Sequence, residues 1–284
     1  MKAPPFGYAR AESLDEALVL LAEAGEEAKL LAGGQSLVPL LAYRLVRPSR
    51  LVDVDRVPGL DGIIARGETL EVGALVRHAQ LERAQLGGAW RLLPEAAAQI
   101  GHVPIRVRGT FGGSLAHADP SAELPVAVLA LDGRIVVASA HGERELEAET
   151  FFTGPFTTAL APYEAISAVR IAAPPGRSAG AFTEFAIRAG DFALAAVAAA
   201  VAVDDDDRVC WLRIALGGIE ATPLRALDAE RALIGAELDH DAIGAAAAAA
   251  AAECEPFADP VYRRELVAAL VRDALVRVRA ELER

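Results

Sequence analysis

Cysteine is scarce in this chain, with Cys210 and Cys254 far apart and without a Cys-x-x-Cys spacing. Iron–sulfur clusters need several closely spaced thiolates, and disulfide-stabilised secreted folds need many paired cysteines. The sequence therefore excludes both, and we expect each cysteine to be a small core residue. The five histidines are scattered without an HxH or HxxxH pattern, so no metal site is predicted.

Positive charge is also in short supply, since 28 Lys and Arg accompany 40 Asp and Glu, giving a net charge of −12. Nonspecific nucleic-acid binding depends on clustered cations, so that function is not expected. The longest apolar run, residues 192–203, is too short to cross a bilayer and predicts one or two buried strands instead. The N-terminal residues show no apolar export signal, which predicts a cytoplasmic protein without membrane insertion.

A first glycine-containing segment follows an apolar stretch near the N-terminus. Residues 30–32 predict a strand that enters Gly33 and Gly34, and Gln35 and Ser36 follow at an expected helix start. Such a turn directs unpaired N–H groups at one point, which suits a phosphate or pyrophosphate. The segment lacks the GxGxxG and GK[ST] spacings, so a plain strand-to-helix turn is an equal alternative for it alone.

A second glycine-containing segment, RGTFGGSLAHADPSAELP, covers residues 108–125. Gly112 and Gly113 are expected to form a loop with positive φ that brings backbone N–H groups close to an anionic cofactor. Asp119 before Pro120 predicts the N-cap and first residue of a helix, and capping alone would explain the aspartate.

Periodicity and turn residues divide the chain into three blocks, 1–58, 59–172 and 179–284. The run 172–180, rich in Pro and Gly, is expected to interrupt secondary structure as a linker. Because the two glycine segments lie in the first two blocks, a shared ligand is expected between those blocks. The predicted helices are 13–25 (from its Ser/Glu capping box and terminal Gly), 89–99, 120–131, 245–252 and 262–282. The predicted strands are 51–55, 69–73, 134–138, 165–171, 195–203 and 209–216, the last two joined by an acidic turn.

Together the two segments resemble those of the FAD-binding medium subunits of molybdenum hydroxylases. Residues 32–39 have the form AGGxSLxP, and residues 108–125 have the form RGTxGGxLAxADPxAExP. The likeness covers essentially the whole chain. It implies an α+β fold: a two-subdomain FAD-binding domain of the vanillyl-alcohol-oxidase/PCMH-like type, followed by a smaller α+β C-terminal domain that covers one side of the cofactor.

The resemblance also implies which residues contact FAD. Residues 32–37 would hold the pyrophosphate, and the second segment would approach the phosphate and ribityl region. Glu123 would face a cofactor hydroxyl, or else be a solvated acid in the first turn of a helix. Ile100 and Ile166 would make apolar contacts to the cofactor, and ordinary core packing would explain them nearly as well. The implied set is Ala32, Gly33, Gly34, Gln35, Ser36, Leu37, Ile100, Thr110, Gly112, Gly113, Ser114, Asp119, Glu123 and Ile166.

Three positions carry separate expectations. Ser114 replaces an asparagine that is frequent in the family, and Glu184 stands where relatives often have lysine, which could alter the flavin potential or the choice of acceptor. His117 is expected to satisfy a local backbone carbonyl or to touch the flavin. No catalytic side chain is predicted, because flavin itself accepts the electrons.

The function implied by the resemblance is electron transfer within a heterotrimer. A large subunit would oxidise the substrate at a molybdopterin cofactor, a small subunit would pass electrons through two 2Fe-2S clusters, and FAD here would deliver them to an external acceptor. A dimer of such heterotrimers is expected. A self-sufficient flavoprotein oxidase of the same fold is the main alternative, although it would need its own substrate pocket. A noncatalytic nucleotide-binding or assembly protein is the third possibility.

Overall fold

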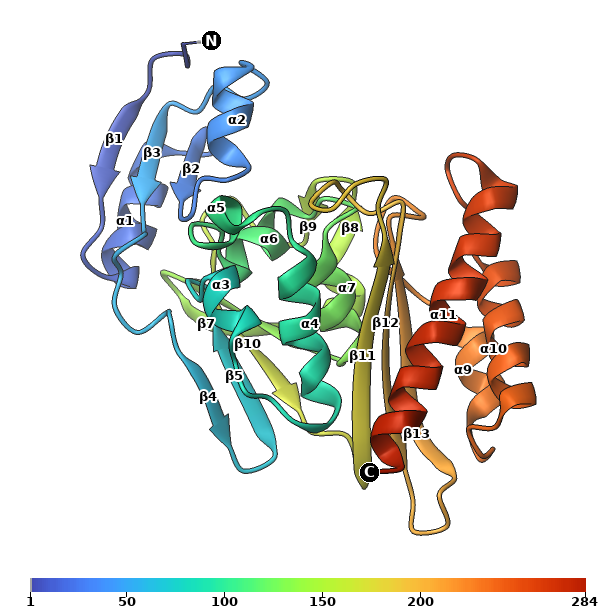
Figure 1. Cartoon of the computed structure of the whole chain (residues 1–284). Helices are drawn as coiled ribbons and strands as arrows, with labels where there is room; N and C mark the ends of the chain where they lie inside the picture. The colour runs from blue at the N-terminus through green and yellow to red at the C-terminus, as the bar shows by residue number, and fades with distance from the viewer. Residues whose placement is uncertain (1) are drawn as a thin grey trace.

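Three larger β-sheets follow one another along the chain in the computed structural model, which describes residues 2–284, and a two-stranded sheet accompanies them (Figure 1). The first is a parallel sheet of three strands in the order β1-β3-β2, and α1 packs against it. Its elements are β1 (Gly7–Arg10), α1 (Leu14–Ala24), β2 (Ala28–Leu31), α2 (Leu37–Ala42) and β3 (Arg50–Asp53).

The predicted capping of α1 is confirmed. The Ser13 hydroxyl accepts a hydrogen bond from the Glu16 N–H at 3.1 Å, and the Glu16 carboxylate accepts one from the Glu12 N–H at 2.7 Å. Gly25 ends the helix with φ 77°, a conformation that costs glycine little. Side-chain capping thus sets the start of this helix, and the backbone conformation of Gly25 sets its end.

The second sheet is antiparallel, in the order β4-β5-β10-β6-β7, and helices cover one of its faces. Among these helices α7, in which every residue is buried, packs against α4 and against β12 and β13 of the third sheet. The strands are β4 (Ile63–Arg66), β5 (Thr69–Gly73), β6 (Arg134–Ser139), β7 (Gly142–Glu147) and β10 (Ala165–Ala172), with a separate pair β8 (Phe152–Gly154) and β9 (Thr157–Thr158). The helices are α3 (His78–Glu82), the 3-10 helix η1 (Gly88–Arg91), α4 (Leu92–Gln99), α5 (Val103–Arg106), α6 (Phe111–His117), α7 (Glu123–Ala130) and α8 (Ala148–Phe151).

The third sheet is antiparallel in the order β11-β12-β13-β14 and is covered on both faces. Alternate residues of β12 belong to different cores: Ala196 and Ala198 pack in the core of α4 and α7, whereas Val197 and Val201 pack toward α9 to α11. Its elements are β11 (Arg177–Phe185), β12 (Ala195–Val203), β13 (Val209–Gly217), β14 (Leu224–Arg225), α9 (Leu227–Leu233), α10 (His240–Glu253) and α11 (Pro260–Leu282).

Small residues let this third sheet approach the second block closely. A Cβ at Gly180 would lie 2.4 Å from the Ala89 carbonyl oxygen, and one at Gly217 would lie 2.3 Å from a methyl of Val126. The Glu95 carboxylate of α4 adds polar contacts, accepting hydrogen bonds from the Phe182 N–H and from Arg277 of α11. One continuous hydrophobic core therefore runs from the second sheet into the third.

The structure corrects several sequence-based expectations. The run 172–180 interrupts secondary structure only at residues 173–176, because β11 begins at Arg177. The helix expected from residue 120 begins at Glu123, and α10 begins at His240 rather than at residue 245. The expected strands and the acidic hairpin turn after Val203 are present. The three block boundaries themselves stay predictions.

The two cysteines lie in different environments. Cys254 is a buried core residue as predicted, but Cys210 is exposed, so the prediction is wrong for that residue. Within residues 2–284, no helix is both long and apolar enough to span a membrane.

Candidate functional site

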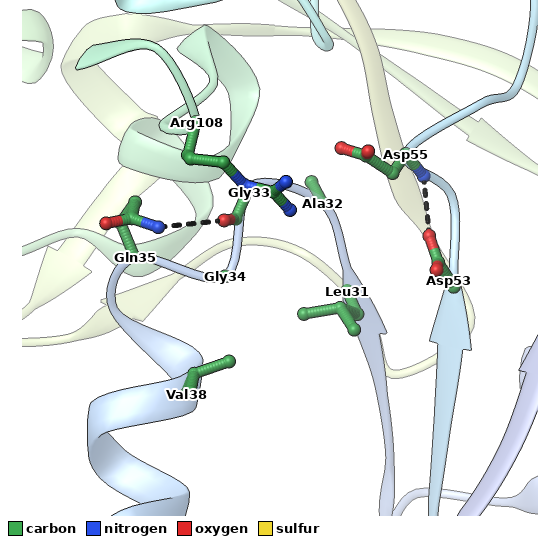
Figure 2. Close-up of a pocket in the computed structure, with 9 residues that line it drawn as sticks. All are labelled: Leu31, Ala32, Gly33, Gly34, Gln35, Val38, Asp53, Asp55 and Arg108. Carbon is green, nitrogen blue, oxygen red and sulfur yellow. Dashed lines mark hydrogen bonds between the residues drawn. The ribbon is translucent and has the colours of Figure 1, made fainter. Parts of the chain in front are cut away.

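The first glycine segment lies at the carboxyl edge of the parallel sheet, directly after β2 and beside the end of β3 (Figure 2). Gly34 has φ 72°, and α2 starts at Leu37, as the strand-to-helix pattern predicts. None of the backbone N–H groups of residues 33–36 donates a hydrogen bond to another part of the described chain, residues 2–284. This segment therefore presents free donors to an oxygen-rich ligand.

The second glycine segment is helical, which corrects the loop expected there. Gly112 and Gly113 lie in α6 and do not have positive φ. The Thr110 hydroxyl caps this helix by accepting a hydrogen bond from the Gly113 N–H at 3.2 Å. A Cβ on Gly112 would lie 2.6 Å from the Cβ of Ala74. These glycines serve close packing and an exposed first helical turn rather than a sharp bend.

The fold brings the two glycine segments into direct contact. A Cβ on Gly33 would lie only 2.2 Å from the Arg108 carbonyl oxygen, so only glycine permits this approach. Beside the contact is a cavity of about 200 Å³. It is lined by Leu31, Ala32, Gly33, Gly34, Gln35, Val38, Asp53, Asp55 and Arg108, as Figure 2 shows. The two segments thus meet beside this cavity, although Arg108 is the one residue of the second segment that lines it, and the shared cofactor site stays a prediction.

Charged side chains surround this cavity. The guanidinium of Arg108 makes no hydrogen bond or ion pair with any residue in the range 2–284, and Figure 2 shows it beside Gly33 and Ala32. In contrast, Asp55 accepts a hydrogen bond from Arg77 at 2.5 Å, and Asp53 accepts one from the Asp55 N–H at 2.9 Å. The cavity thus offers one free cation next to two engaged carboxylates.

Arg108, Asp53 and Asp55 were missed by the sequence-based set. Arg108 is the first residue of the RGT pattern, which is a signal that could have identified it. The two aspartates follow an ordinary strand pattern and carry no such signal. Only the parallel pairing of β2 with β3 places them beside Gly33.

Asp119 does not cap a helix directly. Its carboxylate accepts a hydrogen bond from the Ser121 N–H at 2.9 Å, which closes a turn before α7 begins at Glu123. The N-cap position belongs to Ala122, which has no capping side chain. The capping role expected for Asp119 is therefore wrong, and its side chain orders the preceding turn instead.

Glu123 is buried rather than solvated, with 6% of its surface exposed. Burial, together with the nearby carboxylate of Glu184, raises the pKa of its carboxyl to about 8. Burial likewise raises the pKa of Glu184 to about 7, and one oxygen of that group has no hydrogen-bond partner within residues 2–284. The solvated-acid interpretation of Glu123 is wrong.

The remaining expected residues lie away from the cavity wall. Ile100 and Ile166 are both buried in the core that also contains Phe111, which agrees with the packing alternative. His117 packs its ring 5.1 Å from that of Phe156 and makes no hydrogen bond within the described residues, so the expected backbone carbonyl is not its partner. Burial lowers the pKa of His117.

The cavity fits the diphosphate part of a dinucleotide cofactor such as FAD. Free backbone N–H groups and an unpaired guanidinium are the donors that phosphate oxygens need. The close glycine contact leaves space that a larger side chain would fill. Within residues 2–284 no group of three or more metal-ligating side chains is present.

Comparisons with known proteins decide the family. Residues 4–174 match the family model described as FAD binding domain in molybdopterin dehydrogenase, and residues 180–278 match the CO dehydrogenase flavoprotein C-terminal domain. The chain belongs to the FAD-binding medium subunits of molybdenum hydroxylases. It is thus an oxidoreductase subunit with an FAD-binding domain, and the predicted α+β fold, family and cofactor are confirmed.

Relatives of this medium subunit match it over nearly their full length. The 6-hydroxypseudooxynicotine dehydrogenase complex subunit alpha of Paenarthrobacter nicotinovorans is 42% identical over 98% of this chain and 95% of the relative. Among solved structures, carbon monoxide dehydrogenase from Hydrogenophaga pseudoflava has a TM-score of 0.94 at 35% identity, covering 99% of both chains. Quinoline 2-oxidoreductase from Pseudomonas putida 86 has a TM-score of 0.92 at 35% identity and covers both chains fully.

Proposed function

We propose that this medium subunit carries FAD as the last electron relay of a molybdenum hydroxylase. It would receive electrons from 2Fe-2S clusters of a small subunit, after a molybdopterin-containing large subunit has oxidised the organic substrate. FAD would then deliver the electrons to an external acceptor. The contact between Gly33 and the Arg108 carbonyl carries this proposal, because it joins the two segments implied to hold one cofactor. A cytoplasmic dimer of heterotrimers is the assembly proposed.

The chain's own residues would bind and orient the cofactor. Gly33, Gly34, Gln35 and Arg108 line the cavity, and the free N–H groups of residues 33–35 together with the Arg108 guanidinium would hold the diphosphate. The first turn of α6, with Gly113 and Ser114 at its accessible side, would approach the ribityl region. FAD, when bound, supplies the redox chemistry, so no catalytic acid or base is assigned to the protein.

Other members of the implied set would act further along the cofactor. With its pKa raised to about 8, Glu123 is mostly protonated at neutral pH and would donate a hydrogen bond to a flavin or ribityl oxygen. Ile100 and Ile166 would act through the core beneath α6. Asp119 would keep the turn before α7 in place.

The relay role is favoured over a self-sufficient oxidase by two observations. Relatives that match the chain over nearly its whole length are named as subunits, including a dehydrogenase complex subunit alpha and a nicotine 6-hydroxylase medium subunit. Beyond the glycine segments, residues 179–284 form a sheet packed on both faces, with small side chains filling the side toward α7. An oxidase would need a substrate pocket in that region.

The proposed function predicts that this chain binds FAD but oxidises no organic substrate alone. Dye reduction should be measured with the purified chain and a panel of aldehydes, N-heterocycles and carbon monoxide. Activity is expected only when the two partner subunits are present. Substrate-dependent turnover by the lone chain at an enzymatic rate, on the order of 1 to 1,000 per second, would instead support the oxidase alternative.

Two hydroxyl residues should show different effects. Ser114→Ala should weaken FAD binding by about 1 to 2 kcal/mol with little change in stability, because its half-exposed hydroxyl faces no protein group that needs it. Thr110→Ala should also destabilise the chain by about 1 kcal/mol, because it removes the cap of α6. FAD titration and urea unfolding measure the two effects. Wild-type FAD affinity in both variants would remove α6 from the proposed site.

A further inference from the structure

We propose that Arg77 is a positioning residue for FAD: its guanidinium joins the end of β3 to the second glycine segment and sets the spacing between the two segments. This inference rests on the proposed function. Arg77 lies outside both glycine segments, at the N-terminal boundary of α3. Its role follows from its contacts.

The guanidinium of Arg77 contacts both blocks at once. Nη2 donates a hydrogen bond to a carboxylate oxygen of Asp55, and Nη1 donates one to the Arg108 carbonyl oxygen, each at 2.5 Å. Both side chains of the ion pair are about three-quarters buried. Asp55 follows β3 of the first sheet, whereas Arg108 opens the segment that leads into α6. The planar guanidinium of Arg77 thus connects the end of a strand of the first sheet to the segment that precedes α6.

The carbonyl that Arg77 holds is the one that Gly33 approaches. Its oxygen would lie 2.2 Å from a Cβ at Gly33, so the position of this peptide decides how closely the glycine segments meet. Backbone bonds on either side strengthen the attachment: the His78 N–H donates to the Gly109 carbonyl at 3.1 Å, and the Phe111 N–H donates to the Val76 carbonyl at 2.8 Å. Arg77 therefore holds in place the peptide at which the two glycine segments meet beside the cavity.

Arg77 also controls the charge beside the proposed diphosphate. Asp55 and Asp53 both line the cavity, and an unpaired carboxylate there would repel a phosphate group. Arg77 compensates Asp55, while Asp53 accepts a hydrogen bond from the Tyr8 hydroxyl and lies 3.9 Å from Arg10. Without Arg77, the carboxylate of Asp55 would face the bound anion uncompensated. Both the position of Arg77 and its positive charge therefore favour binding of a diphosphate in this cavity.

The test compares Arg77→Gln with the double variant Arg77→Gln/Asp55→Asn in the full-length chain, purified with any native partners that remain attached. FAD affinity is measured by titration of the apo form, and amide hydrogen exchange of residues 108–113 is measured without FAD. Arg83→Gln is the matched control, because it removes the same charge from an exposed position at the end of α3.

Arg77→Gln should weaken FAD binding about tenfold or more and speed exchange at residues 108–113, whereas Arg83→Gln should change neither. Removing the Asp55 charge should restore much of the affinity without slowing the exchange, a pattern that general destabilisation would not produce. Wild-type FAD affinity and hydrogen exchange in Arg77→Gln would overturn the inference. If the double variant Arg77→Gln/Asp55→Asn bound FAD no better than Arg77→Gln, the claim that Arg77 compensates the charge of Asp55 would be overturned. If the wild-type chain and its complex bind no FAD, the proposed function fails, and the exchange measurement alone decides whether Arg77 positions the segment.

Discussion

Replacing Gly33 by Val should abolish FAD binding while leaving the chain folded. Even a Cβ at this position would lie 2.2 Å from the Arg108 carbonyl oxygen and 2.9 Å from the Cα of Gly109. Because these are backbone atoms, no side-chain rotation relieves the clash, and the two glycine segments must separate. Flavin absorbance after gel filtration measures bound FAD, and circular dichroism measures folding.

Gly87→Val is the matched control for this experiment. Gly87 has an extended backbone with φ −106°, and a Cβ there would have no atom within 4 Å. It should retain stoichiometric FAD. If Gly33→Val also retained FAD at full occupancy, the two segments would not form the binding site, and the assignment of the diphosphate to this cavity would have to be withdrawn.

Glu123→Gln should change how stability depends on pH. The pKa of this carboxyl is about 8 in the folded chain, compared with an ordinary value of 4.5. The folded state therefore binds a proton more tightly than the unfolded state, and stability falls as pH rises between these two values. The wild-type apo chain should lose a few kcal/mol of unfolding free energy from about pH 5 to about pH 8. The glutamine variant should lose much less.

Chemical unfolding of the apo form at several pH values measures this effect. Glu143→Gln, at an exposed position on β7, should keep the wild-type pH dependence. Because Glu184 also has a raised pKa, of about 7, some pH dependence should persist in Glu123→Gln and disappear in the double variant. Equal slopes for wild type and Glu123→Gln would show that Glu123 does not ionise within this range in the folded chain.

Local sequence signals predicted those parts of the fold that local chemistry controls. Ser13 and Gly25 bound α1, and the acidic turn after Val203 joins β12 to β13, because caps and turns depend on residues only a few positions apart. The start of α7 was predicted three residues too early, since Asp119 uses its side chain to order a turn. An aspartate before a proline is compatible with both an N-cap and such a turn, so the pattern alone did not separate them.

The sequence also identified the two glycine segments, but it assigned the wrong reason to the second. Positive φ was expected at Gly112, whereas the residue lies in a helix packed against Ala74. A glycine in the sequence signals that a side chain is not tolerated. Whether backbone conformation or lack of space excludes the side chain depends on neighbours distant in the chain.

The sequence by itself determined the family, the α+β class, the cofactor and the two segments that were proposed to hold it. Long patterns of residue types can be recognised in a sequence without knowledge of three-dimensional contacts. Tertiary structure alone placed Asp53, Asp55 and Arg108 around one cavity and joined Asp55 to the Arg108 carbonyl through Arg77. These groups come from a strand end, a helix boundary and a turn separated by up to 55 positions. Parallel pairing of β2 with β3 and packing of α3 beneath the second segment bring them together, and no local signal encodes that proximity.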